Sequence, residues 1–432
     1  MTRAALALAA AGLAAAAPAG CTGSESGTIA LGLTTAPGSA LLDRVVRLRL
    51  TFTNPSQVIL LDRTEHGFDL VLDLEATGAV GALVVDGLDA TGALVATGMT
   101  PPFPLNGKNA RIVVYMAAPM SLGAAPAALE PARSRPSAAA LTYGVVLAGG
   151  VDAAGAPSDA LQIYNAYDHS FLTGLRMPGR RASATLAVSS NNGVFLFGGV
   201  DPGGVTTGTL WFFNTTIAPS GRYAELSDSP QLARTGRAAI PLGGDSYLIT
   251  GAPALQLAGG QLAEPGAIPA LSSGASVTGS DRAITAVAVD DATGELLRLR
   301  AGAVEMLGAQ QKGGAAVALP GARVAVIGGQ AAPRDAVIVD AGTGALTPVP
   351  GALAEAYEAI ALAATARFVV VAGRRAGAAD TAIEVLDATT LERRHATSVA
   401  DAITAAIALP NGQVLLAGAA LQLFTPPPPP GG

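Results

Sequence analysis

Few of the side chains that usually carry chemistry come near one another in this sequence. The three histidines, His66, His169 and His395, are far apart, and Cys21 is the only cysteine. None of them has the short spacing that zinc ligands or paired-histidine motifs require. Catalysis needs an acid with a base, or a nucleophile with its activator, within hydrogen-bond reach. The sequence therefore predicts no catalytic residue, no metal ligand and no bound cofactor.

Two groups of carboxylates come closest to forming a cation site. Asp290, Asp291 and Glu295 make up one group, and Asp152 with Asp159 makes up the other. Calcium needs several oxygen ligands around one point, whereas these carboxylates flank turns that contain glycine. We therefore expect solvated turns, with a calcium site as the alternative.

Three consecutive aromatic residues could form the floor of a carbohydrate or peptide site. They are Trp211, Phe212 and Phe213. Side chains alternate between the two faces of a strand, so Trp211 and Phe213 share one face and Phe212 lies on the other. This alternation favours core residues packed between neighbouring sheets.

The position of Cys21 after an apolar N-terminal run is the most informative of these features. Arg3 precedes the run from Ala4 to Ala17, which suits the core of a secretion signal. The run is shorter than the roughly 20 residues that a membrane-spanning helix needs. Small residues directly before Cys21 resemble the lipobox of bacterial lipoproteins, although Pro18 stands where an aliphatic residue is usual. The alternative is an ordinary signal peptide cut near Ala19, which would leave a free thiol.

The lipobox resemblance implies a signal peptide over residues 1–20, lipidation of Cys21 and a flexible tether over 21–27. Several acyl chains would give stable anchoring, since one chain binds a membrane only marginally. The expected location is the cell envelope. The chain would be an outer-membrane lipoprotein that is attached to the membrane through its lipid. A net charge of −6 gives no electrostatic surface for nucleic acid.

Short β-branched runs between glycines and prolines predict an all-β protein. Residues 28–121 contain about seven such strands, a spacing typical of a β-sandwich. The expected strands are Thr28–Leu33, Arg44–Phe52, Gln57–Leu61, Phe68–Leu74, Gly81–Val85, Ala93–Ala96 and Ala110–Met116. This pattern is similar to the immunoglobulin-like sandwiches of bacterial surface lipoproteins. Ala352–Ala364 is rich in alanine, but the turn and strand residues on both sides favour a strand over a helix.

Beyond residue 126 the chain is internally repetitive. A strand that ends in glycine recurs at Val145–Gly150, Val194–Gly199, Tyr247–Gly251, Val324–Gly329, Phe368–Gly373 and Val414–Gly418, with a degenerate copy at Arg282–Leu299. A third strand follows in most copies. Arginines lead into the early repeats, and we expect them to make structural hydrogen bonds between repeats instead of binding an anion: Arg135, Arg181 and Arg234.

The repeats resemble the kelch repeat of β-propellers, whose glycine pair is the strongest part of the match. The resemblance implies a seven-bladed propeller over residues 127–424, with six blades as the alternative, although the fourth strands lack the tryptophan typical of kelch blades. The last repeat is one strand short, and we expect Ala127–Pro131 to complete it and close the ring. Residues 425–432 form a proline-rich tail expected to adopt polyproline II.

The sequence therefore favours a non-catalytic protein that binds an unknown protein or glycan at the cell envelope. The alternative is a hydrolase or lyase acting on polysaccharide on the same scaffold. Related propellers include galactose oxidase, whose copper site needs a cysteine within the propeller; Cys21 lies in the signal region, which excludes that chemistry. Acids, histidines or tyrosines that converge at one mouth of the channel would distinguish the two functions.

Overall fold

A computed structural model describes residues 26–75, 78–104, 110–215 and 222–429. Cys21, the predicted signal peptide and residues 21–25 of the predicted tether lie outside these residues. The described residues form strands and two short 3-10 helices, η1 (Leu41–Arg44) and η2 (Pro230–Leu232). None of their helices is long and apolar enough to cross a membrane. The all-β prediction is confirmed, and Ala359–Ala364 is a strand.

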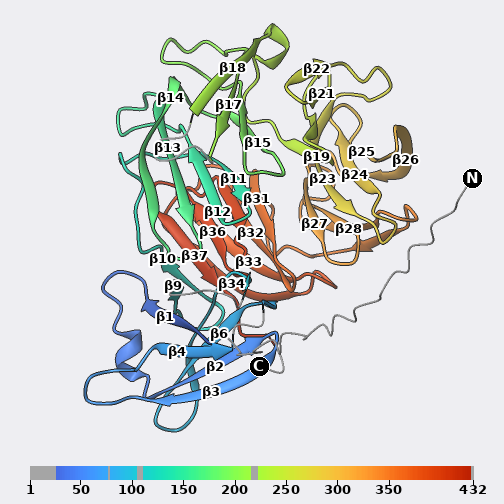
Figure 1. Cartoon of the computed structure of the whole chain (residues 1–432). Helices are drawn as coiled ribbons and strands as arrows, with labels where there is room; N and C mark the ends of the chain where they lie inside the picture. The colour runs from blue at the N-terminus through green and yellow to red at the C-terminus, as the bar shows by residue number, and fades with distance from the viewer. Residues whose placement is uncertain (1–25, 76–77, 105–109, 216–221, 430–432) are drawn as a thin grey trace, which may run out of the picture.

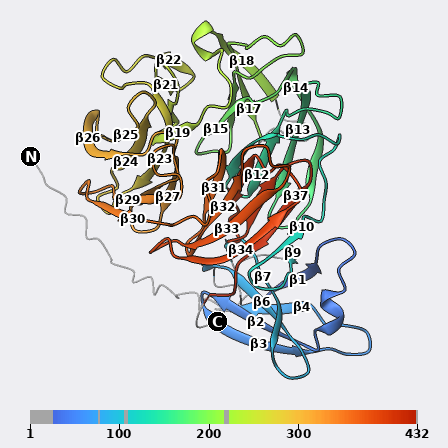
Figure 2. The ribbon, with the colours of Figure 1, turned by 180° about the vertical axis from the view of Figure 1, so that it is seen from behind.

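Two larger sheets and one two-stranded sheet form the N-terminal region, drawn mainly in blue beside the other sheets in Figures 1 and 2. One has the order β4 (Val71–Glu75), β1 (Ser26–Thr34), β9 (Ala110–Tyr115), and β1 runs parallel to β9. The other has the order β3 (Ser56–Asp62), β2 (Arg47–Thr53), β6 (Leu83–Leu88), β7 (Leu94–Met99), and β5 (Val80–Gly81) pairs separately with β8 (Phe103–Pro104). Leu31, Leu50, Val85 and Val114 share one hydrophobic cluster, so the two sheets pack on a common core.

The described residues from Ser121 to Thr425 form seven four-stranded antiparallel sheets. We number them by their order along the chain. The first contains β11 (Ser137–Leu141), β12 (Gly144–Ala148), β13 (Ser158–Asn165) and β14 (Phe171–Arg181); the second contains β15 (Thr185–Val188), β16 (Val194–Phe197), β17 (Thr209–Asn214) and β18 (Arg222–Asp228). The third contains β19 (Ala239–Gly243), β20 (Ser246–Ile249), β21 (Leu255–Ala258) and β22 (Gln261–Ala263); the fourth contains β23 (Leu271–Thr278), β24 (Ile284–Asp290), β25 (Glu295–Arg300) and β26 (Ala303–Gln310).

The later sheets repeat the same order. The fifth contains β27 (Ala315–Leu319), β28 (Arg323–Ile327), β29 (Ala336–Asp340) and β30 (Leu346–Val349); the sixth contains β31 (Ala359–Ala364), β32 (Phe368–Arg374), β33 (Thr381–Asp387) and β34 (Arg393–Val399); the seventh contains β35 (Ala405–Ala408), β36 (Val414–Ala417), β37 (Leu421–Thr425) and β10 (Ser121–Ala124). The first strand of each sheet contacts the first strand of the next, and β35 contacts β11. The sheets therefore close into a propeller-like ring with these strands innermost.

The strand that completes the seventh sheet differs from the predicted one. β10 pairs antiparallel with β37, with Leu122 opposite Phe424. Ala127–Pro131 does not supply this strand, because the pairing ends where Ala125 N donates to Leu421 O and Pro126 has no N–H to continue it. Leu129 is instead buried in the hydrophobic cluster beside this sheet.

The recurring glycine pairs follow the second strands because backbone carbonyls pass close to them. Gly149 and Gly198 both have positive φ. A Cβ on Gly149 would overlap with the carbonyl oxygen of Arg181, the last residue of β14, and a Cβ on Gly198 would overlap with that of Arg234, which lies between the second and third sheets. Those carbonyls accept hydrogen bonds from the second glycine of each pair, Gly150 N at 3.1 Å and Gly199 N at 2.7 Å. Glycine is therefore required for the backbone to approach and bond at these turns.

Candidate functional site

A cavity of about 570 Å³ opens among loops of the fourth, fifth and sixth sheets. We call it the glycine cavity, and its lining includes Ser272, Ser273, Gly313, Gly314, Gly329 and Tyr357. Most of these residues lie at the start of an innermost strand or just before one. The cavity therefore lies where the loops surround the centre of the ring, on the side where the glycine pairs turn.

Tyr357 forms a fixed wall of the glycine cavity. Its hydroxyl donates to Oε1 of Glu384 at 2.6 Å, and Glu384 is buried. Both oxygens of Glu384 also accept from Ala354 N, at 3.1 and 3.0 Å, and Arg393 lies 3.3 Å away. Burial and the Glu384 carboxylate raise the pKa of Tyr357, so its hydroxyl stays protonated and its ring is held in place.

The rest of the glycine cavity presents small residues and hydrogen-bonding groups. Ser273 Oγ donates to Gly314 O at 2.5 Å, and Gln330 and the exposed carboxylate of Glu358 also line the cavity. Buried Gln311 lies beside Gly329, and its Oε1 has no hydrogen-bond partner among the described residues. One aromatic ring, amides, hydroxyls and backbone groups suit recognition of a ligand rich in hydroxyl or amide groups.

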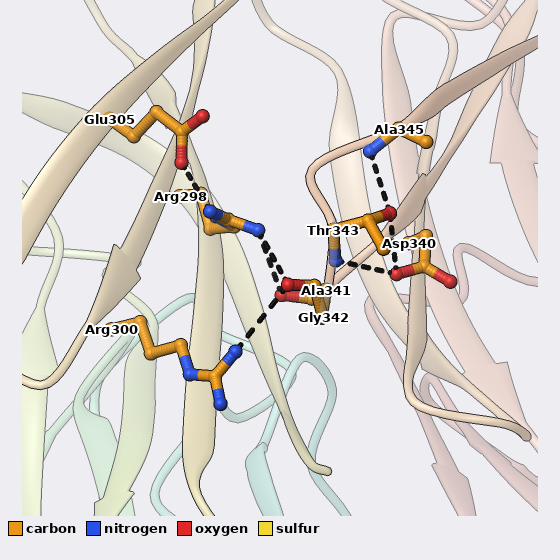
Figure 3. A network of polar contacts seen from close by, with 8 residues as sticks. All are labelled: Arg298, Arg300, Glu305, Asp340, Ala341, Gly342, Thr343 and Ala345. Carbon is orange, nitrogen blue, oxygen red and sulfur yellow. Dashed lines mark hydrogen bonds and ion pairs between the residues drawn. The ribbon is translucent and has the colours of Figure 1, made fainter.

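A second cavity, of about 670 Å³, opens among the hairpin turns on the other side of the ring. Figure 3 shows two arginines of β25 reaching the turn after β29. Arg298 donates to Gly342 O at 2.9 Å and pairs with Glu305 at 2.5 Å, and Arg300 donates to Gly342 O at 3.4 Å. Arg300 also pairs with Asp281. These charges connect the fourth sheet to the fifth.

Asp340 lines the same cavity but serves its own turn. Its Oδ1 accepts from Thr343 N at 2.8 Å and from Thr343 Oγ1 at 2.9 Å (Figure 3). These bonds hold the pKa of Asp340 below its usual range. A general acid needs a raised pKa, so Asp340 is suited to structure and not to proton donation.

None of the three histidines lines the glycine cavity. His66 is exposed beside Glu65, and His395 lies on β34. His169 is buried, where Nε2 accepts from Tyr115 N at 3.2 Å and Nδ1 lies 2.6 Å from Tyr164 Oη. Since Nε2 is an acceptor, the neutral ring carries its proton on Nδ1 and donates to Tyr164. Burial lowers the pKa of His169 to about 4, and the residue joins the N-terminal region to the first sheet.

The predicted carboxylate groups act as turn caps or ion-pair partners. Asp290 Oδ1 accepts from Ala292 N and Thr293 N at 2.8 Å each. Asp152 likewise accepts from two backbone amides of its turn, and Asp159 pairs with Arg176 at 2.6 Å. Among the residues that the structure describes, no three His, Cys, Asp or Glu side chains form a group that could hold a metal ion. Asp290 is buried and caps its own turn, whereas Asp152 caps an exposed one.

The aromatic residues of β17 are core residues, as predicted. Trp211 and Phe213 are buried in the cluster between the first and second sheets, and Phe212 packs on the other face. The Arg181 guanidinium stacks 4.6 Å from the centre of the Trp211 ring. These aromatics therefore do not form the floor of an open site.

The arginines that lead into the repeats are structural, but the prediction that their side chains hydrogen bond between repeats is wrong. Arg135 is exposed, with φ of 52°, and buried Arg133 donates within the first sheet, to Gly149 O at 2.9 Å and Gln162 Oε1 at 2.7 Å. Arg234 donates to Pro253 O at 2.6 Å, within its own sheet. Their guanidinium hydrogen bonds do not join two sheets, and the backbone carbonyls of Arg181 and Arg234 accept from Gly150 N and Gly199 N.

A recurring spacing could have identified Arg133 from the sequence. Arg133, Arg181 and Arg234 each stand two residues before a position with positive φ, occupied by Arg135, Ser183 and Gly236. Only the third of these positions is a glycine, so the pattern is hidden in the first two repeats. The glycine cavity itself was not predicted, because its lining comes from three separate repeats.

Comparison with known proteins gives little beyond the fold. No family model matches the chain, and no curated protein matches it. A solved streptogramin B lyase structure is similar to this chain, with a TM-score of 0.48 and 14% identity, over 71% of this chain and 97% of that chain. At this identity the similarity concerns the fold alone.

Proposed function

We propose that the ring is a seven-bladed, kelch-like propeller that binds a protein or glycan at the cell envelope and does not catalyse a reaction. The N-terminal region is then an immunoglobulin-like sandwich, and a lipid on Cys21 anchors the chain in the outer membrane. The lining of the glycine cavity is the observation that supports binding. Glycines and serines leave space beside a ring that Glu384 holds in place.

The same lining argues for binding over polysaccharide cleavage. Glycoside hydrolysis usually needs two facing carboxyl groups, one of them with a raised pKa. Glu358 lines the glycine cavity and is exposed, while Glu384 lies behind Tyr357 and is engaged by Tyr357 Oη and Ala354 N. A polysaccharide hydrolase or lyase would need a different arrangement of acids.

Binding and cleavage can be separated in one assay. The full chain is incubated with a panel of soluble oligosaccharides and cell-wall glycans, and both retention on the protein and release of new reducing ends are measured. The expected result is retention without release, weakened in Gln330→Ala and unchanged in the matched exposed variant Gln261→Ala. Release of reducing ends that disappears in Glu358→Gln would establish hydrolysis and refute the proposal.

The membrane anchor is tested separately. Cys21→Ser should move the protein from the membrane fraction to the soluble fraction, because this thiol carries the only proposed lipid. Cells expressing wild type and variant are fractionated and the protein is followed by immunoblot. Retention of the variant in the membrane pellet would show that lipidation at Cys21 is not the anchor.

A further inference from the structure

A third cavity, of about 690 Å³, lies between the third and fourth sheets. We call it the seam cavity, and its lining includes Leu242, Ile268, Ile284, Leu299, Val304 and Arg282. We propose that it binds an amphiphile that has a hydrocarbon chain and a carboxylate head, such as a medium-chain fatty acid. The site is separate from the glycine cavity and does not depend on the proposed function.

The seam cavity exists because the two facing sheets differ in strand length. The outer strand of the third sheet, β22, has 3 residues, whereas β26 of the fourth sheet has 8. Both strands lie at the outer edge of the ring in Figures 1 and 2. The connection that follows β22 lines the cavity with Pro265–Ile268 in place of a longer strand. An irregular segment therefore lines this seam beside the short strand β22.

The walls of the seam cavity are apolar and only partly buried. Leu242, Ile268 and Val304 pack on the edge of the core between these sheets without being enclosed by it. Ile284 is also partly exposed, and Leu299 is the buried base of the group. Apolar side chains that line a space of this size lose water favourably when a hydrocarbon chain fills it.

Positive charge at the rim selects the head group. The Arg282 guanidinium is exposed and makes no hydrogen bond or ion pair with another described residue. Arg300 lies beside it in the lining but is already engaged by Asp281 and by Gly342 O. Arg282 is therefore the cation free to meet a carboxylate while the chain enters the cavity.

Binding is measured with dansyl-labelled undecanoic acid, with decanoate and decanol as unlabelled competitors. The full chain should bind the probe with enhanced fluorescence, because the dansyl group enters an apolar site. Val304→Trp, which fills the cavity, should weaken binding about tenfold or more. Leu242→Phe fills the cavity from the opposite wall. If one of the two variants fails to fold, the other still tests whether filling the cavity weakens probe binding. The matched control Leu172→Trp, at an exposed position on β14, should bind as wild type does.

The head group is tested with Arg282→Gln, compared with Arg180→Gln on β14. Loss of one charge-assisted hydrogen bond should weaken competition by decanoate about tenfold and leave decanol unchanged. Equal weakening of both competitors would overturn the assignment of Arg282 to a carboxylate. Probe binding that persists in both Val304→Trp and Leu242→Phe would place the ligand elsewhere and overturn the site.

Discussion

Two seams of the same ring are packed in different ways. The closing seam, between the seventh and first sheets, buries Tyr164, Leu423 and Leu415 completely. The seam between the third and fourth sheets leaves a cavity of about 690 Å³ beside Leu242. Both are built from the same four-stranded unit, so the repeat alone does not determine packing. Strand length and the neighbouring segments decide which seam is filled.

Polar contacts reinforce the closing seam. Buried Gln413 donates from Nε2 to Thr425 Oγ1 at 2.9 Å and to Tyr115 O at 3.4 Å, which connects the seventh sheet to the N-terminal region. His169 makes a similar connection to the first sheet. Buried polar groups that find partners specify one arrangement, because any other leaves them unpaired. The closing seam is thus filled and has paired polar groups beside it, whereas the seam between the third and fourth sheets contains open space.

The largest expected effect is at the closing seam. Leu423→Ala should lower the free energy of unfolding by about 2–5 kcal/mol, because it removes most of a fully buried side chain and leaves a cavity. The matched change Leu242→Ala should cost less than about 1.5 kcal/mol, since that side chain already borders open space. Urea denaturation of both variants measures the difference. Equal losses would show that the two seams are packed alike.

The next effect is a pH dependence that comes from His169. Its pKa is about 4 in the folded protein and near 6.5 when unfolded, so the unfolded chain binds the additional proton between these values. Stability should therefore be complete above pH 6.5 and fall by on the order of 3 kcal/mol as the pH drops to about 4. The physical reason is that burial disfavours the charged imidazolium, and a protonated Nε2 also cannot accept from Tyr115 N.

Denaturation at a series of pH values tests this contribution. His169→Gln should be less stable at neutral pH and show a flatter profile between pH 4 and 6.5. His66→Gln, which changes an exposed histidine, should keep the wild-type profile. A wild-type slope that remains in His169→Gln would assign the pH dependence to other groups.

The smallest expected effect on stability comes from enlarging a side chain in each seam. Leu242→Phe should raise stability by up to about 1 kcal/mol, because the added atoms enter existing space. The same enlargement in the closing seam, Leu415→Phe, should cost about 1–3 kcal/mol through overpacking. Melting curves of the two variants give the sign of each change. Destabilisation by both would mean that the seam cavity cannot hold larger side chains.

The sequence was most informative where a local rule forces a residue type. The glycine-ended strands at Val145–Gly150 and Val194–Gly199 were found because a neighbouring carbonyl excludes any Cβ at Gly149 and Gly198. The closing strand was misplaced because Ser121–Ala124 and Ala127–Pro131 differ little in local pattern, and the pairing partner lies in β37. Tyr357 and Glu384 meet only through folding. A cavity produced by mismatched strand lengths has no local signature.

The pairing of β10 with β37 also sets an order of events during folding. Leu122 and Phe424 are neighbours in the seventh sheet, yet about 300 residues separate them along the chain. During synthesis β10 emerges before every other strand of the ring and β37 after all of them. Until then β10 has no partner and the edge of β36 is open, which is the condition under which strands pair with other chains. The growing protein is therefore most in need of a chaperone just before the ring closes.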